Sequence, residues 1–435
     1  MTPSNMRLTI TNHPNSGAHK KEIYISIIGE DPSDSSKFGY VDFKSGKAVF
    51  STKSSWQFDP STMAKTLDGL SFPLNVPRLN SARIYFSVYD NLASFPASGP
   101  SASKGELTLF DKIEFENGDS NPNINGTSVD FYGISYVISG TDHSKGAVSF
   151  GYNKSRADII GALSNCPTSP HTQRSGNNGI LASSFMKNPT GEVLRVLAPK
   201  TMALTDWPQT KANDAWWATC CSHFLDDYVK KHCFKPGRKF SFYSKNYPND
   251  KTVFYGSVDP SGNNINLWTD KANTVPYAPV PKLNIPCASW PDPNFETSPD
   301  LYHDVSGTQD QIDWGFLLLG NSAGTGAAEN WGNDPLCMAI MVSICRGVMH
   351  RDDGTTSWID SNKYYLGNGA TPPKATEDMP IFYYSKILHE MGKDGKAYVL
   401  SYDDVYGENP SIFFAGHPDV TIDLYGLDKV LLKPV

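Results

Sequence analysis

The chain has no hydrophobic run long enough to cross a membrane. Its longest apolar stretch, residues 336–345, has ten residues, whereas a membrane-spanning helix needs about 20. We therefore expect a buried helix there and no membrane partner. Residues 1–5 lack the apolar segment of a secretory signal, which leaves open a mature form, an intracellular form or export by another route.

Positive charge is also scarce. The 38 Lys and Arg residues are outnumbered by 45 Asp and Glu residues, which gives a net charge of −7. The basic residues form no block that could follow a phosphate backbone, so nucleic acid is not expected as a partner.

Several signatures of cofactor and metal chemistry are missing. There is no GxxxxGK[ST] or GxGxxG nucleotide loop, and the pair His389–Glu390 lacks the second histidine of a zinc protease. None of the seven cysteines forms a CxxC pair, although some could form disulfides. The sequence therefore predicts neither a metal nor an organic cofactor.

Aromatic residues, in contrast, are abundant: 9 Trp, 21 Tyr and 22 Phe. Sugar-binding proteins use such rings as apolar platforms, but an aromatic-rich β core uses them as well, and the core interpretation is favoured. Hydrophobic residues at 39% and charged residues at 19% indicate a folded protein, and 435 residues suggest about two domains.

The first 152 residues have the pattern of β structure. Short segments rich in Ile, Val, Phe and Tyr alternate with clusters of Gly, Pro, Asn and Ser, which is typical of an antiparallel sandwich or barrel. The predicted strands are residues 7–11, 22–29, 82–89, 106–116 and 128–139.

The middle of the chain mixes helical and strand patterns, and the end returns to β. Predicted helices cover residues 156–163, 213–232 and 335–350, and predicted strands cover 239–243, 252–258 and 265–269. Three more strands are predicted at 397–402, 411–415 and 420–424. This order predicts a β domain of residues 1–152 plus 378–435, into which a mixed α/β domain of residues 153–377 is inserted.

Two carboxylates in the strand segments are the best catalytic candidates. Alternation in residues 107–116 places Glu114 on the face opposite Ile113 and Phe115, and the next predicted strand carries Asp130. If the two strands pair, both carboxylates face one cleft, which suits the acid and base of glycosidic bond cleavage. Spacing alone favours ordinary exposed carboxylates over this interpretation.

The segment Thr108-Leu-Phe-Asp-Lys-Ile-Glu114-Phe, followed by Thr127-Ser-Val-Asp130-Phe, resembles the active-site strands of glycoside hydrolase family 64. The stretch Lys396-Ala-Tyr-Val-Leu-Ser-Tyr-Asp-Asp404 resembles the C-terminal signature of the same family, and the matching segments occur in the family's order along the chain. These are thaumatin-like endo-β-1,3-glucanases, including a laminaripentaose-producing type.

The resemblance implies a role for each matched residue. Glu114 matches the general acid and Asp130 the general base, and Thr127 takes the place of a small hydroxyl residue near the sugar. Asp403 and Asp404 match a segment that lines the acidic cleft, although a structural turn explains them equally well.

The segment after Glu114 departs from the family. Glu116 and Asn117 stand where a neutral hydroxyl and another polar side chain are expected, so both are substrate-binding candidates of altered character. A further carboxylate at Glu116 would favour the protonated form of Glu114 by like-charge repulsion. Trp216, at the start of a predicted helix, is a candidate groove residue, with core packing favoured.

The resemblance implies a thaumatin-like β-sandwich or barrel with a wide groove beside the α/β part. It implies hydrolysis of β-1,3-glucan to short laminari-oligosaccharides by an inverting mechanism that needs no cofactor. We expect a monomer that acts outside the cell. The rival hypothesis is a thaumatin-like glucan-binding or antifungal protein without catalysis.

Overall fold

The computed structural model is mainly β. It describes residues 5–14, 17–101, 107–118, 122–165, 184–198, 239–244, 252–258, 265–268, 383–399, 410–414, 416 and 418–427, and the statements below concern these residues. Among them, no helix is long and apolar enough to span a membrane.

The larger sheet follows one path of strands joined by antiparallel pairing. In spatial order it contains β18 (Ser411–Phe413), β9 (Asn123–Gly126), β8 (Leu109–Glu116), β7 (Asn80–Val88), β2 (Ile23–Asp31), β3 (Asp34–Asp42) and β4 (Lys47–Thr52), and β5 (Lys65–Thr66) pairs with β2 off this path. Strand β8 is thus bonded on both sides, to β7 and β9.

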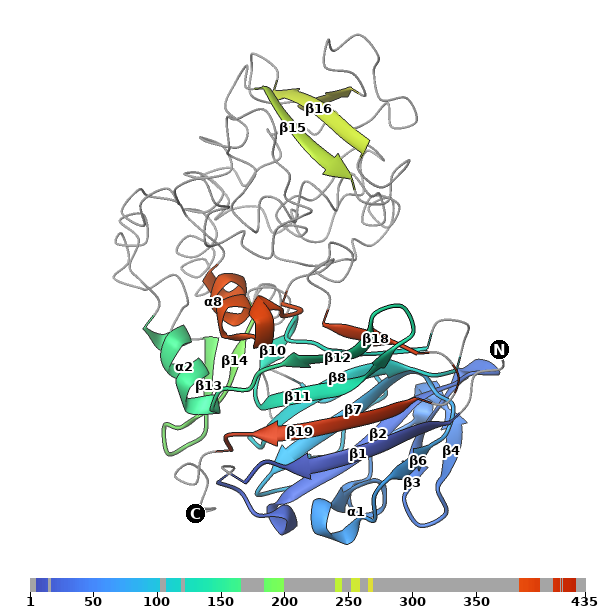
Figure 1. The fold of residues 1–435 in the computed structure, drawn as a ribbon. Helices are drawn as coiled ribbons and strands as arrows, with labels where there is room; N and C mark the ends of the chain where they lie inside the picture. The colour runs from blue at the N-terminus through green and yellow to red at the C-terminus, as the bar shows by residue number, and fades with distance from the viewer. Residues whose placement is uncertain are drawn as a thin grey trace, which may run out of the picture.

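The second sheet contains five strands and joins the two ends of the chain. Its order is β12 (Gly146–Gly151), β11 (Ser135–Asp142), β19 (Asp419–Tyr425), β1 (Met6–Asn12) and β6 (Leu74–Val76). The C-terminal strand β19 lies between β1 and β11 and runs parallel to β1 (Figure 1). Both C-terminal strands therefore complete sheets that N-terminal residues begin.

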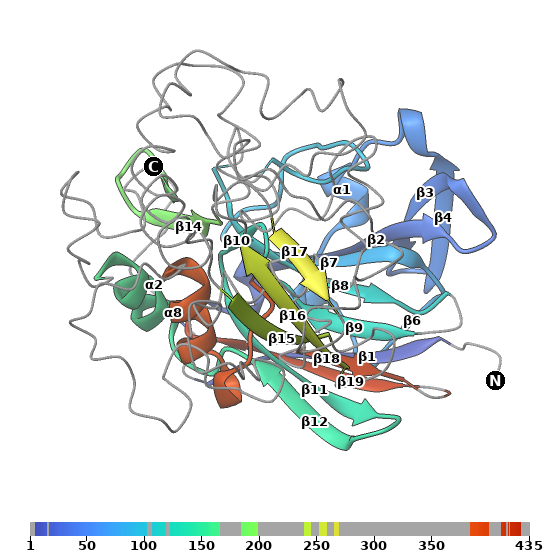
Figure 2. The ribbon, with the colours of Figure 1, turned by 90° about the horizontal axis from the view of Figure 1, so that it is seen from above.

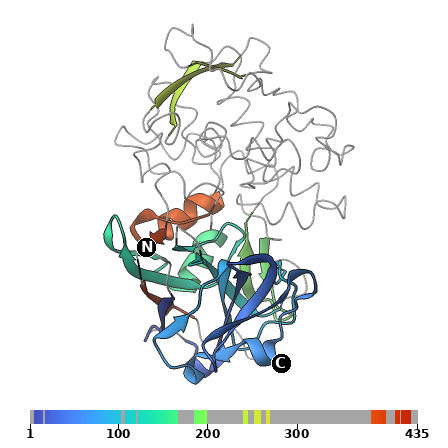
Figure 3. The same ribbon diagram turned by 90° about the vertical axis from the view of Figure 1, so that its right-hand side faces the viewer.

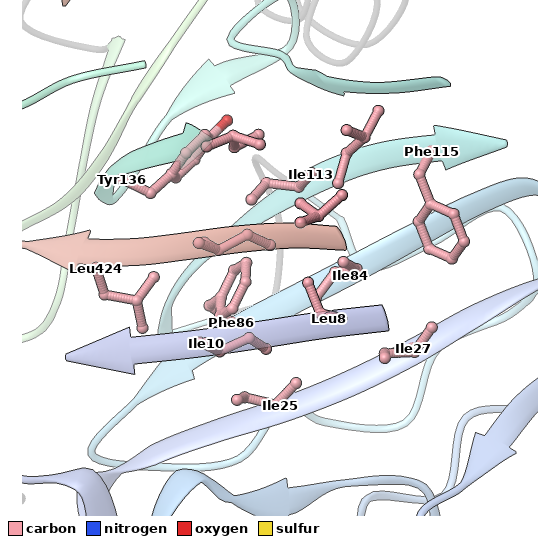
Figure 4. Packing of buried hydrophobic residues seen from close by; sticks show 14 of the residues in the cluster. Leu8, Ile10, Ile25, Ile27, Ile84, Phe86, Ile113, Phe115, Tyr136 and Leu424 are labelled. Carbon is pink, nitrogen blue, oxygen red and sulfur yellow. The ribbon is translucent and has the colours of Figure 1, made fainter. Parts of the chain in front are cut away.

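The two sheets pack face to face around one apolar core. Alternate residues of each strand point inward, for example Ile25 and Ile27 on β2 and Ile113 and Phe115 on β8. Figure 4 shows Leu8 of β1 over these side chains from the opposite sheet. The sequence pattern predicts an antiparallel sandwich or barrel, and the structure has the packing of a sandwich.

A second, smaller core lies at one end of the sandwich. Helix α2 (Arg156–Ser164) and helix α8 (Tyr383–Met391) lie side by side there (Figure 1, Figure 2), next to a small sheet of β10 (Phe131–Tyr132), β14 (Val193–Leu197) and β13 (Phe185–Lys187). Figure 3 shows α8, in orange, beside the sandwich strands. The core joins residues from both sides of the predicted domain boundary at residue 152: Tyr132, Tyr152, Ile159, Leu163, Val196, Ala198, Tyr384, Ile387, Leu388, Ala397 and Val399.

Several predicted elements are confirmed and two are wrong. Helix α2 begins where the pattern places it. The three predicted strands are present as β15 (Lys239–Ser244), β16 (Thr252–Val258) and β17 (Ile265–Trp268), and they form an antiparallel sheet. The described part of the predicted strand 397–402, residues 397–399, forms only an isolated bridge, between Tyr398 and Thr127, instead of a strand. The predicted helices at 213–232 and 335–350 lie outside the described residues.

The predicted strand of residues 128–139 is also wrong, because it divides into β10 and β11 with Gly133 between them. A Cβ atom on Gly133 would lie 2.2 Å from the carbonyl oxygen of Phe110, so only glycine allows this close approach to β8. Residues 123–126, which lie between two predicted strands, form β9 and pair with β8 in place of residues 128–139.

Candidate active site

Strand β8 carries Glu114 on the face that points away from the sandwich core. Ile113 and Phe115 are buried in the core, while Lys112, Glu114 and Glu116 alternate with them on the other face. Glu114 is flanked by Arg83 of β7 and Asn125 of β9, its direct partners in the ladder. Its side chain is 34% exposed, which leaves the carboxylate accessible.

Asp130 lies just before β10, outside any strand, and its side chain is 32% exposed. The residues before it form a tight turn in which the Thr127 hydroxyl accepts a hydrogen bond from the Val129 N–H at 3.3 Å. The Asp130 carbonyl oxygen accepts a hydrogen bond from the Ala198 N–H at 3.0 Å, beside the β10–β14 pairing.

Lys112 brings the two carboxylates together. Its ammonium donates to Glu114 Oε1 at 3.0 Å and to Asp130 Oδ2 at 2.5 Å. Its side chain is only 10% exposed, and Arg83 Nε lies 4.0 Å from the same Glu114 oxygen. The two carboxylates thus face one partly open site. The strand pairing on which the sequence analysis based this arrangement does not occur, because Asp130 lies outside any strand and β9 is the neighbour of β8.

Asp111, the neighbour of Lys112, ties β8 to the segment after Asp130. Its buried Oδ2 accepts hydrogen bonds from the N–H groups of Gly133 and Ile134, both at 2.8 Å, and Oδ1 accepts from the N–H of Lys112 at 2.7 Å. Burial raises the pKa of Asp111 to about 7, although the three hydrogen bonds favour the ionised form. Two adjacent residues of β8 therefore hold the segment around Asp130: Asp111 on the core-facing side of the strand bonds Gly133 and Ile134, and Lys112 on the opposite side bonds Asp130.

Two tyrosines from the C-terminal part of the chain hold the same segment. The Tyr384 hydroxyl on α8 donates to the Ser128 carbonyl oxygen at 2.8 Å, and the Ser128 N–H donates to the Tyr398 carbonyl oxygen at 2.7 Å. Ser128 Oγ also lies 3.1 Å from the Tyr152 hydroxyl. The base candidate is thus positioned by residues more than 250 positions away in sequence.

The structure separates the remaining sequence candidates. Glu116 lies two residues beyond Glu114 on the same face and is half-buried. Thr127 is 3% exposed and shapes the turn before Asp130, which is a supporting position. Asn117 is completely buried, and its side-chain amide bonds the Leu79 N–H and the Pro77 carbonyl oxygen. The expected sugar contact at Asn117 is therefore replaced by a structural role.

Three candidates, Asp403, Asp404 and Trp216, lie outside the described residues. Within the described part of the chain, no three His, Cys, Asp or Glu side chains gather as metal ligands would.

Comparison with known proteins identifies the family. A family model described as Beta-1,3-glucanase (glycoside hydrolase family 64) matches residues 4–235, which is more than half of the 435-residue chain. The chain belongs to this family. It is a glycoside hydrolase, and both Glu114 and Asp130 lie within the matched residues. No curated protein sequence matches it.

Solved structures of family 64 glucanases have the same fold. The β-1,3-glucanase domain of Clostridium beijerinckii is 18% identical, with 97% of this chain and 98% of that chain covered and a TM-score of 0.58. A laminaripentaose-producing β-1,3-glucanase in complex with laminaritetraose is also 18% identical, with coverage of 98% and 100% and a TM-score of 0.63. A laminaripentaose-producing enzyme of Paenibacillus barengoltzii is 14% identical over 97% and 75%, with a TM-score of 0.52.

Sequence reasoning about this β-1,3-glucanase missed Lys112 and Asp111. The alternation on β8 contains a signal for both: Asp111 occupies a core-facing position between Leu109 and Ile113, where a charged side chain needs partners. Lys112 precedes Glu114 by two residues and therefore shares its face. Neither pattern indicates that the partners come from the segment around Asp130.

Proposed function

We propose that this glucanase cleaves within β-1,3-glucan chains and releases short laminari-oligosaccharides with inversion at the anomeric carbon. The observation that carries the proposal is the pair Glu114 and Asp130, two partly exposed carboxylates joined through one ammonium. The laminari-oligosaccharide products named for two structural relatives support the choice of product.

In the proposed reaction Glu114 donates its proton to the glycosidic oxygen as the bond to the anomeric carbon breaks. Asp130 removes a proton from a water molecule, and the water oxygen forms the new bond on the opposite face of the sugar. One water is consumed, Glu114 is left ionised and Asp130 protonated, and solvent restores both. The net reaction requires no cofactor.

The geometry sets a condition on this mechanism. The two oxygens that share the Lys112 ammonium can be no further apart than the sum of 3.0 and 2.5 Å. Inverting enzymes hold their carboxyl groups about 6.5–9.5 Å apart to admit water, and retaining enzymes about 5–5.5 Å apart. This limit applies to one oxygen of each group and is compatible with both ranges, and we propose that the two groups move further apart when glucan and water enter.

The proposed architecture is a thaumatin-like sandwich domain, residues 1–152 plus 378–435, with residues 153–377 as the other wall of a wide groove. The pairing of β18 and β19 with N-terminal strands supports a sandwich domain that contains both ends of the chain.

We further propose a monomer that acts outside the cell on a neutral β-1,3-glucan. Sedimentation analysis would test the monomer, and activity on a β-1,4-glucan equal to that on laminarin would contradict the specificity.

Digestion of laminarin and curdlan tests the function. The wild-type protein should release oligosaccharides, and Glu114→Gln and Asp130→Asn should each lower kcat by about 10²–10⁴-fold. Asp419→Asn, which removes an exposed partner of Arg7 far from the site, should leave kcat within about twofold. Binding of glucan without products would favour the non-catalytic alternative.

Early proton NMR spectra of the digest test the stereochemistry. Inversion of a β bond gives a product with the α configuration at its new reducing end, which is visible before mutarotation. If the β anomer forms first, the short distance between the carboxylates reflects a retaining mechanism and the roles assigned here are wrong.

A further inference from the structure

One cation joins the two carboxylates, and it is buried. The ammonium of Lys112 contacts both Glu114 and Asp130, while its side chain is only 10% exposed. Among the described residues, the titratable groups Arg83 and Tyr85 of β7 also face it. A buried ammonium is costly unless it is paired, so the position of Lys112 and those of the carboxylates depend on one another.

Backbone pairing and hydrogen bonds fix the position of the Lys112 backbone, from which the side chain extends to the two carboxylates. Lys112 lies in the middle of β8, opposite Tyr85 in the β7 ladder, and its own N–H donates to Asp111. Asp111 in turn holds Gly133 and Ile134, a few residues after Asp130. The distance from the Lys112 backbone to the Asp130 segment is therefore set by hydrogen bonds that do not involve the ammonium.

We propose that Lys112 is the positioning residue of the catalytic pair: its ammonium holds Glu114 and Asp130 in the free enzyme, and it stays with Asp130 and keeps it ionised when Glu114 carries the proton. This inference rests on the roles proposed for the two carboxylates. It adds a third group, which contacts the acid and the base and needs no contact with the sugar.

The charges explain how this arrangement works. Burial would lower the pKa of the Lys112 ammonium, but the charges of Glu114 and Asp130 outweigh burial and raise it far above its ordinary value, so Lys112 stays charged. Glucan is neutral and brings no competing anion. A protonated Glu114 no longer attracts the ammonium as a carboxylate does, which frees the carboxyl groups to separate and admit the water that inversion needs.

The pH profile of kcat/KM on laminarin tests the proposal in the full-length enzyme. A neighbouring cation lowers the pKa of a carboxyl group by about 1–3 units. Lys112→Met should therefore move the acidic limb to higher pH by about one unit or more and lower the maximum by about tenfold or more. Lys112→Arg keeps the charge, so its limbs should stay within about half a unit of wild type. Lys145→Met, which changes an exposed lysine, is the control.

A second measurement does not depend on activity. Urea unfolding of wild type, Lys112→Met, Asp130→Asn and the double variant forms a double-mutant cycle. Coupling between residues 112 and 130 should be present at pH 7, where the carboxylate is ionised, and should weaken as the pH falls below 3 and the carboxylate takes up a proton.

These results separate the two proposals. A wild-type protein that releases no oligosaccharides would refute the proposed function, while the cycle would still show whether Lys112 holds Asp130. Coupling that is equal at pH 2 and pH 7, or a Lys112→Met enzyme whose limbs do not move while its rate falls, would overturn the role of Lys112. If Lys112→Met does not fold, a Lys112→Arg enzyme whose limbs shift by a unit or more would overturn it as well.

Discussion

Glu114 and Asp130 are held in place by different means. Glu114 is part of β8, whose backbone is bonded to strands on both sides and whose inner face fills the sandwich core. Asp130 lies outside any strand, in a segment held by individual bonds from Asp111, Tyr384 and Tyr398. A sheet spreads its support over many contacts, whereas the Asp130 segment depends on a few, so single substitutions should affect the base far more than the acid.

The largest effect is expected from Asp111→Ala. The change leaves three buried N–H groups without their acceptor, each at a cost of about 1–3 kcal/mol, and releases the segment that follows Asp130. We expect a loss of more than about 3 kcal/mol in the free energy of unfolding and a fall in kcat of about 100-fold in the protein that remains folded. Urea unfolding and laminarin kinetics measure both.

Asp142→Ala is the matched control. Asp142 also accepts three backbone hydrogen bonds, from Ser144, Lys145 and Phe413, but it is the last residue of β11, at the start of the hairpin to β12. Asp142→Ala should lower the free energy of unfolding by an amount comparable to that of Asp111→Ala and leave kcat nearly unchanged. An equal loss of kcat in both variants would show that the Asp111 bonds have no special relation to the site.

The same two aspartates should give opposite pH dependences of stability. The folded-state pKa of Asp111 is about 7, above its ordinary value of 3.8, so its proton favours the folded state. This contribution is complete below about pH 4 and is lost as the pH rises through 7, by on the order of 4 kcal/mol. Burial opposes the ionised form of Asp142, but hydrogen bonds outweigh it and lower its pKa to about 2, so its contribution is lost as the pH falls from 4 to 2.

Unfolding midpoints of wild type, Asp111→Ala and Asp142→Ala between pH 2 and pH 9 test these signs. The difference between wild type and Asp111→Ala should shrink as the pH rises through 7, and the difference for Asp142→Ala should shrink below pH 4. A wild-type advantage over Asp111→Ala that grows with pH would reverse the assignment.

Tyr384→Phe should lower stability and kcat less than Asp111→Ala does, and again through the position of Asp130. It removes the hydrogen bond from the hydroxyl to the Ser128 carbonyl oxygen and keeps the buried ring. We expect a loss of about 0.5–1.5 kcal/mol in stability and a several-fold fall in kcat with little change in KM. Tyr40→Phe on β3, far from the site, is the control. An unchanged kcat would show that α8 does not position Asp130.

The same comparison explains which parts of the site the sequence predicts. Period-2 alternation places Glu114 on the outer face of β8, since one strand carries both the pattern and the residue. The sequence pattern of residues 128–139 predicts one strand, but the chain divides at Gly133, where the backbone approaches Phe110 closely. That contact belongs to the tertiary fold, so the sequence pattern does not indicate it. Tyr384 and Tyr398 reach Ser128 through the tertiary fold, so no local spacing indicates them. The strand pattern made Asp130 a candidate but favoured an ordinary exposed carboxylate, and the resemblance to the family supplied its expected role as the general base.

The smallest effect on activity is expected from Ile113→Val, a change in the strand that carries Glu114. Ile113 lies between Lys112 and Glu114 but points into the sandwich core, where its side chain is completely buried. Ile113→Val removes one methylene group and should cost about 0.5–1.5 kcal/mol in stability. The backbone hydrogen bonds to β7 and β9 hold Glu114 in place and do not depend on the methylene group that Ile113→Val removes. The kcat and KM on laminarin should therefore stay within about twofold of wild type. A fall in kcat as large as that of Tyr384→Phe would mean that Glu114 depends on single contacts as Asp130 does, and the proposed difference between the two carboxylates would be lost.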